Sequence, residues 1–218
     1  MDGPTPSFDY IKDPDDIYRK SFATVHDEID LGLFQGLMAD VAVRVVHASG
    51  MPDVAQKIKY SKNAAEIGKS ALMNGARVYV DAEMVGAGII KSRLPKNNLV
   101  CCTLNDPGIH NDAKRAKTTR SAVAVDRWIK NLDGAVCVFG NAPTALFRLL
   151  EWLKDGAVKP ALIIGFPVGF VGAEESKQAL IDNTENVPYI ALAGRQGGSA
   201  MAAAVCNALG NRIGKTGI

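Results

Sequence analysis

The chain has 218 residues, of which 47% are hydrophobic and 22% charged, and its formal net charge is +2. A chain of this length and composition can bury a globular core without disulfides or a metal. The small net charge excludes a strongly basic nucleic-acid binder, and no apolar run is long enough to span a bilayer. The polar, acidic start does not resemble a signal or transit peptide. We therefore expect a cytoplasmic protein that binds neither nucleic acid nor membrane, with residues 1–218 forming a single domain.

The first 75 residues show helical patterning and no convincing strand. Asp13-Pro14 can start a helix, because proline suits a first helical turn. Farther on, one apolar residue per turn indicates an amphipathic helix that ends at Gly50. This apolar stripe consists of Ile29, Leu33, Leu37, Val41 and Val45. The helices after the first are expected over residues 28–50, 52–60 and 61–75. We expect this helical segment to pack on the α/β core formed by residues 76–218.

Residues 76–218 alternate short, β-branched apolar runs with helical stretches. Each apolar run ends near glycine, proline or aspartate, as is typical of strands buried on both faces. The strands are expected over residues 77–82, 98–104, 134–140, 160–166 and 188–194. The helices are expected over residues 82–92, 118–132, 142–156, 173–183 and 199–211. This alternation predicts an α/β fold with a doubly wound, mainly parallel sheet of about five strands.

Three expected strands run directly into glycine-rich turns that precede helices. The turns are FGNAPTAL (139–146), GFPVGFVGAEES (165–176) and GRQGGSAMA (194–202). Ligands of open α/β sheets bind beyond the carboxyl ends of the strands, where free N–H groups at helix starts suit phosphates or carboxylates. Glycines that merely permit tight turns would explain one such loop more easily than three. No turn matches G-x-G-x-x-G or the P-loop, so an anionic ligand is favoured over a standard nucleotide.

His47 is one of only three histidines and falls in the last turn of the expected helix 28–50, within the stretch RVVHASG. It can simply cap the helix, since a cation gains about 0.3–1 kcal/mol at a helix C-terminus. The same field stabilises imidazolium, which would suit a proton donor. Position alone favours the cap. Arg44 lies three residues earlier and shares a helix face with His47, although a solvated surface arginine would look the same.

Other polar residues are weaker candidates. Arg120 is expected in the first turn of a helix, where a cation opposes the helix dipole; such a local cost indicates either function or an ordinary surface arginine. Asp81 and Glu83 follow the first strand and could supply a base, although a strand-end aspartate is often only an N-cap. His26 and His110 lie in polar surroundings and are expected at the surface.

The four cysteines show no metal-binding pattern. Cys101, Cys102 and Cys137 lie in apolar strand-like runs, and Cys206 lies in an alanine-rich helix. There is no C-x-x-C motif and no Cys/His cluster, so a zinc site has almost no support. Buried, reduced thiols of a cytoplasmic protein are the simplest interpretation.

Taken together, the motifs resemble the precorrin-8X methylmutases of corrin biosynthesis and their cobalt-precorrin-8 counterparts, over nearly the whole chain. The resemblance rests on RVVHASG, DAEMVGAGI, LNDP, TTRSA, GNAPTALFRLLE, IGFPVGFVGAEESKQAL and GRQGGSAMAAAVCNAL. It implies a Rossmann-like α/β core with added helices, assembled as a homodimer. It also implies an intramolecular [1,5] shift of a methyl group from C-11 to C-12 of precorrin-8X, giving hydrogenobyrinic acid. By the same resemblance, no S-adenosylmethionine, nicotinamide or metal cofactor is expected to be consumed.

The resemblance also assigns residue roles. His47 matches the acid/base histidine, which would protonate the macrocycle. Ser21 and Arg44 correspond to substrate-contacting positions, and Arg120 to an active-site arginine. Tyr18, one helical turn before Ser21, is carried over by the same likeness. Asn141, Thr144 and Ser199 are candidate substrate contacts from their position in the glycine-rich loops.

Two hypotheses compete with a methylmutase. A non-catalytic corrinoid carrier would share the pocket but would not need His47, so it would bind precorrin-8X without converting it. A nucleotide-binding regulator or transferase is compatible with the fold class alone, but the missing phosphate-binding fingerprints count against it.

Overall fold

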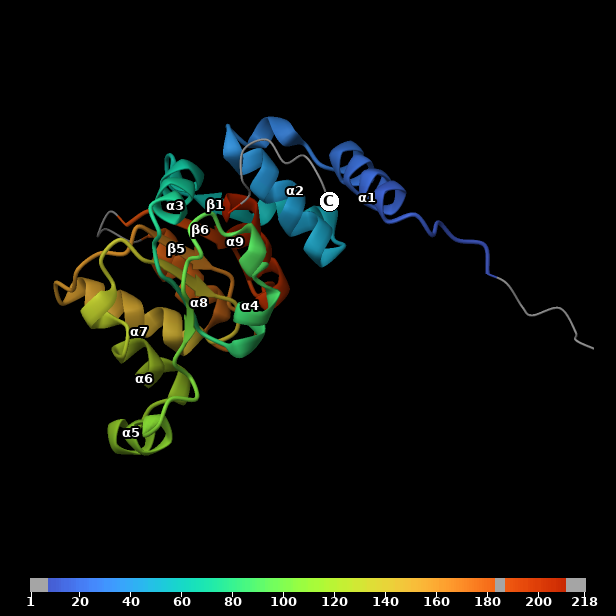
Figure 1. The fold of residues 1–218 in the computed structure, drawn as a ribbon. Helices are drawn as coiled ribbons and strands as arrows, with labels where there is room; N and C mark the ends of the chain where they lie inside the picture. The colour runs from blue at the N-terminus through green and yellow to red at the C-terminus, as the bar shows by residue number, and fades with distance from the viewer. Residues whose placement is uncertain (1–7, 183–186, 211–218) are drawn as a thin grey trace, which may run out of the picture.

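The computed structural model describes residues 8–182 and 187–210, in which a central sheet is covered by helices (Figure 1). Six strands form this sheet in the order β1-β6-β5-β4-β2-β3. The edge strand β1 runs antiparallel to β6, and all other pairings are parallel. The strands are β1 (Ile58–Tyr60), β2 (Val78–Val80), β3 (Val100–Cys102), β4 (Val136–Phe139), β5 (Leu162–Gly165) and β6 (Tyr189–Leu192).

The five expected strands are all present and parallel to one another. Counted alone along the chain, they follow the order 2-1-3-4-5 across the sheet. This is the flavodoxin-like doubly wound order, whereas a dinucleotide-binding Rossmann sheet has the order 3-2-1-4-5-6. The direction of winding reverses between β2 and β4, and a ligand crevice is expected at the carboxyl ends of these strands.

The sixth strand corrects the expectation that residues 1–75 contain no strand. The expected helix over residues 52–60 forms only a short 3₁₀ turn, η2 (Pro52–Lys57), before the chain extends into β1. Lys59 is exposed between buried Ile58 and half-buried Tyr60, which is the alternation of an edge strand with one covered face. Three residues are too few for this period to be distinguished from a helical turn in the sequence.

The expected helix over residues 28–50 is interrupted. Asp30 accepts the N–H of Gly32 and caps a 3₁₀ turn, and Gly36 adopts a φ of 55° just before the next helix starts. Leu33 of the expected stripe is therefore 51% exposed. Gly50 ends the helix in the left-handed conformation, as expected. The segments are α1 (Pro14–Glu28), η1 (Leu31–Leu33) and α2 (Leu37–Ser49).

Helices cover both faces of the sheet, each with its own core cluster. On one face Val138 and Ile164 pack with α2, α3, α4 and α9, and on the other Phe139 and Ile163 pack with α6, α7 and α8. The sheet is therefore doubly wound, as predicted. The remaining helices are α3 (Ala64–Met73), α4 (Glu83–Gly88), η3 (Lys91–Arg93), α5 (Ile109–Ala116), α6 (Arg120–Asp126), η4 (Ile129–Asn131), α7 (Pro143–Lys154), α8 (Ala173–Ile181) and α9 (Ser199–Gly210).

The helix boundaries differ from expectation in three places. The expected helix over residues 118–132 divides into α6 and η4, and the one over residues 82–92 ends at Gly88. Helix α5 is an addition to the predicted elements; it is short and mostly polar, and it buries only Ile109 and Ala113, which lie four residues apart on one face. The last residues of the helices expected to end at 183 and 211 lie outside the described part of the chain.

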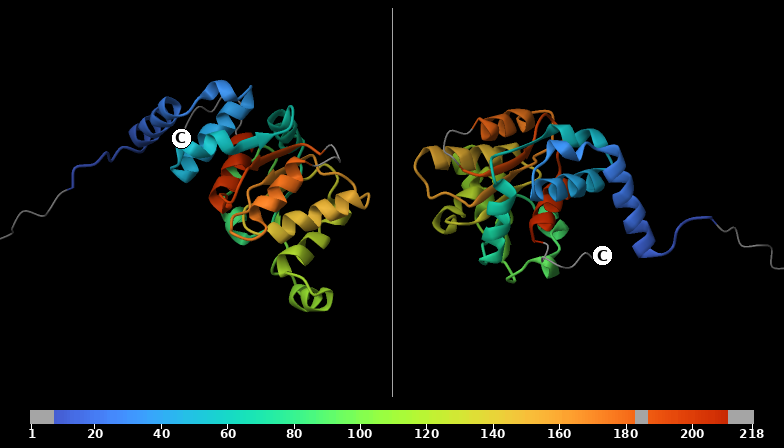
Figure 2. Two further views of the ribbon diagram at one scale, coloured as in Figure 1. Left: turned by 180° about the vertical axis from the view of Figure 1, so that it is seen from behind. Right: turned by 90° about the horizontal axis from the view of Figure 1, so that it is seen from above.

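Helix α1 projects from the body, and both views in Figure 2 show it lying apart from the sheet. It packs on α2 through half-buried Phe22 and buried Val25, while Ile17 on its outer side is 48% exposed. Helices α2 and α3 pack on the sheet core, and the organisation of residues 1–218 as a single domain stays a prediction. None of the described helices has the length and apolar character needed to cross a membrane.

Candidate active site

The glycine-rich turns gather at the carboxyl edge of the sheet because the strands that precede them are parallel. A buried aspartate organises the first of these turns. Asp81, 2% exposed, accepts backbone N–H groups from Gly140 at 2.9 Å, from Asn141 at 2.9 Å and from Ala142 at 2.6 Å. Burial raises the pKa of the Asp81 carboxyl, and the three N–H donors act in the opposite sense. Asp81 is therefore neither an N-cap of α4 nor an exposed base; it holds the loop between β4 and α7.

The turns after β5 and β6 are bonded to each other. The N–H of Gly198 donates to the carbonyl of Phe166 at 2.8 Å, and the N–H of Gly169 donates to the carbonyl of Arg195 at 3.2 Å. Gly197 lies so close to the carbonyl oxygens of the neighbouring turn that a Cβ atom there would overlap them. Gly197 is therefore needed for close approach of the two backbones, which places the start of α9 beside the end of β5.

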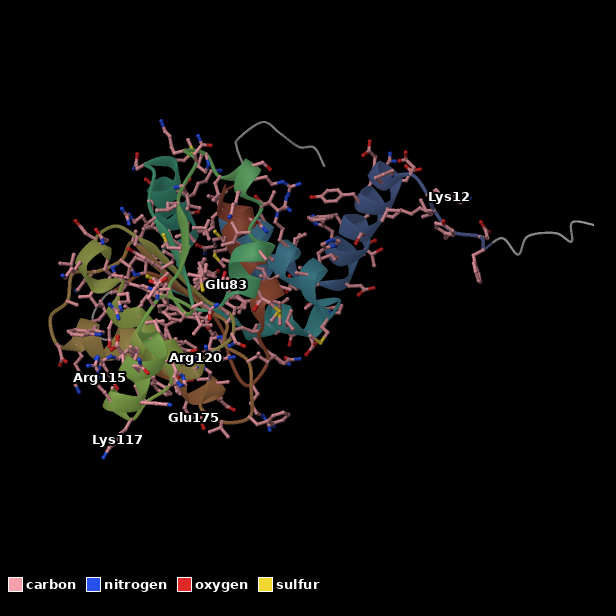
Figure 3. All side chains as sticks on the ribbon, turned by 60° about the horizontal axis from the view of Figure 1, so that its bottom comes forward. Lys12, Glu83, Arg115, Lys117, Arg120 and Glu175 are labelled. Carbon is pink, nitrogen blue, oxygen red and sulfur yellow. The ribbon has the colours of Figure 1, made fainter. Side chains whose placement is uncertain are left out.

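Arg120 lies at the same edge, as the first residue of α6, and this confirms its expected position in a first helical turn. Thr119 caps α6 by accepting the N–H of Ala122, and its hydroxyl also contacts the hydroxyl of Thr144 at 2.7 Å. The start of α6 is thereby fixed to the start of α7. Figure 3, in which the bottom of Figure 1 is turned toward the viewer, labels Arg120 and Glu83.

His47 lies in the last turn of α2 against α1. Its Nδ1 is 2.9 Å from the hydroxyl oxygen of Ser21. The imidazole packs against the ring of Phe22, with 4.8 Å between the ring centroids. The ring of Tyr18 stacks on Phe22 as well, with 4.2 Å between their centroids. The guanidinium of Arg44 lies over the Phe22 ring, 5.6 Å from its centroid. His47 is exposed, so an oriented imidazole with a cation beside it faces solvent.

The end of α2 is attached to the turn after β6. The Gln196 amide contacts the sulfur of Met51 at 3.7 Å, just beyond the end of α2, and accepts a hydrogen bond from Lys57 Nζ at 2.7 Å. The carbonyl of Gln196 accepts a hydrogen bond from Lys177 Nζ at 2.5 Å. His47 is therefore held at the carboxyl edge, the same edge as the glycine-rich turns.

Comparisons with known proteins agree with this geometry. The profile of the precorrin-8X methylmutase family matches residues 16–212. A Pseudomonas aeruginosa protein named precorrin-8X methylmutase is 52% identical over 201 residues, which are 92% of this chain and 97% of that protein. A cobalt-precorrin-8 methylmutase of Priestia megaterium is 36% identical, over 90% of this chain and 87% of its own.

The crystal structure of the precorrin-8X methylmutase from Thermus thermophilus superposes with a TM-score of 0.81 at 37% identity, over 90% of this chain and 94% of that one. The chain belongs to the precorrin-8X methylmutase family. Because the named relatives are methylmutases, which are isomerases, the predicted enzyme class is confirmed, and the nucleotide-binding hypothesis loses its support.

The predicted site residues of the methylmutase fall into two groups. Tyr18, Ser21, Arg44 and His47 form one cluster of contacting or neighbouring side chains where α1 meets α2. The other four belong to the strand-end loops: Arg120 and Thr144 lie at the linked starts of α6 and α7, and Asn141 lies on the loop held by Asp81. Ser199 begins α9, whose backbone packs against Gly140. The two groups are joined through Gln196.

Four residues of the site were not predicted from the sequence. Phe22 supports the imidazole, and its signal was available, since it lies one helical turn after Tyr18 and next to Ser21. Thr119 is the residue before an expected helix start, which is a recognisable N-cap signal. The roles of Gln196 and Lys177 depend on contacts between distant segments, for which a single sequence offers no signal.

The remaining candidates do not add a site. His26 and His110 are exposed, as expected. Residues 8–182 and 187–210 contain no group of three or more histidine, cysteine or acidic side chains that could hold a metal. The cysteines are free, and burial raises the pKa of the Cys102 thiol to about 11. A hollow of about 1130 Å³ that includes Arg77 and Asp133 lies at the opposite edge, where the strands begin, and none of the predicted site residues line it.

Proposed function

We propose that this methylmutase catalyses migration of the ring methyl group from C-11 to C-12 of precorrin-8X, or of its cobalt form, in cobalamin biosynthesis. His47 gives a proton to the macrocycle and takes it back. The product is hydrogenobyrinic acid, or its cobalt counterpart. The reaction is an isomerisation with no net change in protons, so one residue can serve as acid and then as base. No cofactor is required for this balance.

The observation that carries this proposal is the pairing of His47 with Ser21. When Nδ1–H donates to the Ser21 hydroxyl, the tautomer is fixed and Nε2 is left to exchange the proton with substrate. Phe22 holds the plane of the ring, so the imidazole is oriented before substrate arrives.

The charges around the site suit a macrocycle that carries acetate and propionate groups. Arg44 lies beside His47, and Arg120 stands at the start of α6, where it opposes the helix dipole and can meet a carboxylate. Helix starts after β5 and β6 add N–H donors for the rim of the ring. Tyr18 and Phe22 offer an apolar surface to its face. Asn141, Thr144 and Ser199 complete the proposed set of rim contacts.

We further propose a cytoplasmic homodimer. Helix α1 projects from the body with its outer apolar side chains exposed, although it carries Ser21. A second copy of the chain that covers α1 would remove this surface from water and stabilise the Ser21–His47 contact.

The test is an anaerobic incubation of the purified protein with precorrin-8X, and in parallel with its cobalt form, followed by ultraviolet–visible spectroscopy. Conversion to the hydrogenobyrinate spectrum without added cofactor supports the mutase and shows which metal state it accepts. A bound but unchanged substrate spectrum would support the carrier hypothesis. The His47→Asn variant is expected to bind substrate without converting it.

A further inference from the structure

Lys177 is a lysine buried inside the protein, outside the residues that face the proposed substrate. It lies on α8, its relative exposure is 0%, and Glu174 on the same helix is its charged neighbour. Its Nζ donates to the carbonyl of Gln196 at 2.5 Å. Among the described residues this carbonyl is its one hydrogen-bond acceptor. A buried cation is thus directed at the backbone of one glycine-rich turn.

The side chain of Gln196 connects this turn to the segment that follows α2. Its side-chain oxygen accepts from Lys57 Nζ at 2.7 Å, and Lys57 is paired with Asp53 at 2.6 Å. Its amide nitrogen contacts the sulfur of Met51 at 3.7 Å. Through one residue, therefore, α8 is connected to both ends of the short segment that follows α2.

The segment that Gln196 holds begins four residues after His47. Ser49 braces it from the other side, because its hydroxyl donates to the carbonyl of Val46 at 3.0 Å and accepts the N–H of Met51 at 3.1 Å. The end of α2 is thereby fixed between its own last turn and the turn after β6. A displacement of Gln196 would shift the last turn of α2, and His47 with it.

We propose that Lys177 is a positioning residue for His47, acting through Gln196 and Met51 to set the end of α2 against the carboxyl edge of the sheet. This inference rests on the proposed function of His47. Lys177 touches neither substrate nor His47, so its effect on the reaction is one of geometry. A misplacement of about 1 Å from a distant residue can cost roughly 100-fold in rate.

Stability alone does not account for a lysine at this position. A methionine would fill the same space without placing a charge in the interior, and such replacements are often neutral or stabilising. Burial also lowers the pKa of Lys177 to about 8, which records the cost of the charged form. A costly group retained beside an active-site turn is typical of residues that serve function rather than stability.

The experiment compares Lys177→Met with Gln196→Ala and with a control, Lys154→Met, an exposed lysine at the end of α7. Initial rates of precorrin-8X conversion are measured per folded molecule over a range of substrate concentrations. For Lys177→Met we expect kcat to fall by about 10–100-fold with KM within about threefold of the wild-type value, and no loss of thermal stability. For Gln196→Ala we expect a fall in kcat at least as large, because this variant removes the side chain through which Lys177 acts. Because the two residues act in series, the double variant is expected to be no slower than Gln196→Ala. The control keeps wild-type kinetics.

Nuclear magnetic resonance of the three histidines gives a second readout that does not depend on turnover. The His47 signal, assigned from its absence in His47→Asn, is expected to shift in Lys177→Met and in Gln196→Ala, while the signals of His26 and His110 stay in place. Unchanged His47 signals together with kcat within twofold of wild type would overturn the proposal. If Lys177→Met does not fold, Gln196→Ala decides by the same two measurements. A shifted His47 signal in a protein whose wild type converts nothing would uphold the positioning role and reject the proposed function.

Discussion

Replacement of Asp81 by asparagine tests how the loop after β4 is held. The carboxylate accepts three N–H groups, two of them on one oxygen. An asparagine that keeps its amide oxygen over Asn141 and Ala142 turns its NH₂ group toward the N–H of Gly140. Two buried donors are then without acceptors, at about 1–3 kcal/mol each. Relief of a buried charge offsets part of this cost, so we expect the free energy of unfolding to fall by about 2–4 kcal/mol.

Urea unfolding followed by circular dichroism measures this difference, with Asp155→Asn as the control, because Asp155 is an exposed residue just after α7. A domain of ordinary stability, about 5–15 kcal/mol, stays folded after the Asp81 change. The loop that carries Asn141 is then less ordered, and weaker binding of hydrogenobyrinic acid is expected. If Asp81→Asn is no less stable than Asp155→Asn, the three N–H bonds do not hold this loop and the reasoning is refuted.

Three further changes test other parts of the site. Ser21→Ala removes the partner of His47 Nδ1, and we expect kcat to fall about 10-fold with little change in KM; unchanged kinetics would separate Ser21 from proton transfer. Gly197→Ala forces a methyl group into the carbonyl oxygens of the neighbouring turn and is expected to lower stability by about 1–3 kcal/mol in thermal unfolding, whereas Gly86→Ala, which has room, is tolerated. Burial lowers the pKa of Lys177 from 10.5 to about 8, so the unfolded chain binds more protons than the folded chain between these two pH values. As the pH rises from about 8 to 10.5, the free energy of unfolding of the wild type is therefore expected to rise by about 3 kcal/mol relative to that of Lys177→Met. If the free energies of unfolding in urea of the wild type and Lys177→Met change with pH in the same way, burial does not disfavour the charged form of Lys177.

The sequence predicts the parallel core well because its strands are short, nearly continuous apolar runs, and those in the middle of the sheet are buried on both faces. Val136 to Phe139 show this plainly, since all four are buried. Edge strand β1 is not predicted from the sequence, because only one of its faces is covered and it is three residues long. The late start of α2 is not predicted because the apolar period continues through Leu33, whereas the Asp30 cap and Gly36 keep residues 29–36 out of a continuous helix.

In the candidate site, too, some residues are predicted from local patterns and some contacts are not. His47 and the strand-end turns are recognisable because each depends on a local signal, a helix end or a glycine cluster. The contact of His47 with Ser21 joins residues 26 positions apart, and that of Lys177 with Gln196 joins two separate helix–strand units. Asp81 was weighed as a base or an N-cap, and its actual partners lie about 60 residues away on the loop after β4. Such pairings arise from the packing of the sheet, which local patterns do not encode.

The proposed reaction depends on His47 as the acid/base of a methyl shift. The most direct measurement uses precorrin-8X labelled with ¹³C in the C-11 methyl group and follows it by nuclear magnetic resonance, with wild type and His47→Asn in parallel. We predict that wild type moves the label to C-12 without cofactor, and that His47→Asn binds the substrate and leaves the label at C-11. Migration at a comparable rate in His47→Asn would contradict the assignment of His47, and no migration with wild type would contradict the proposed reaction.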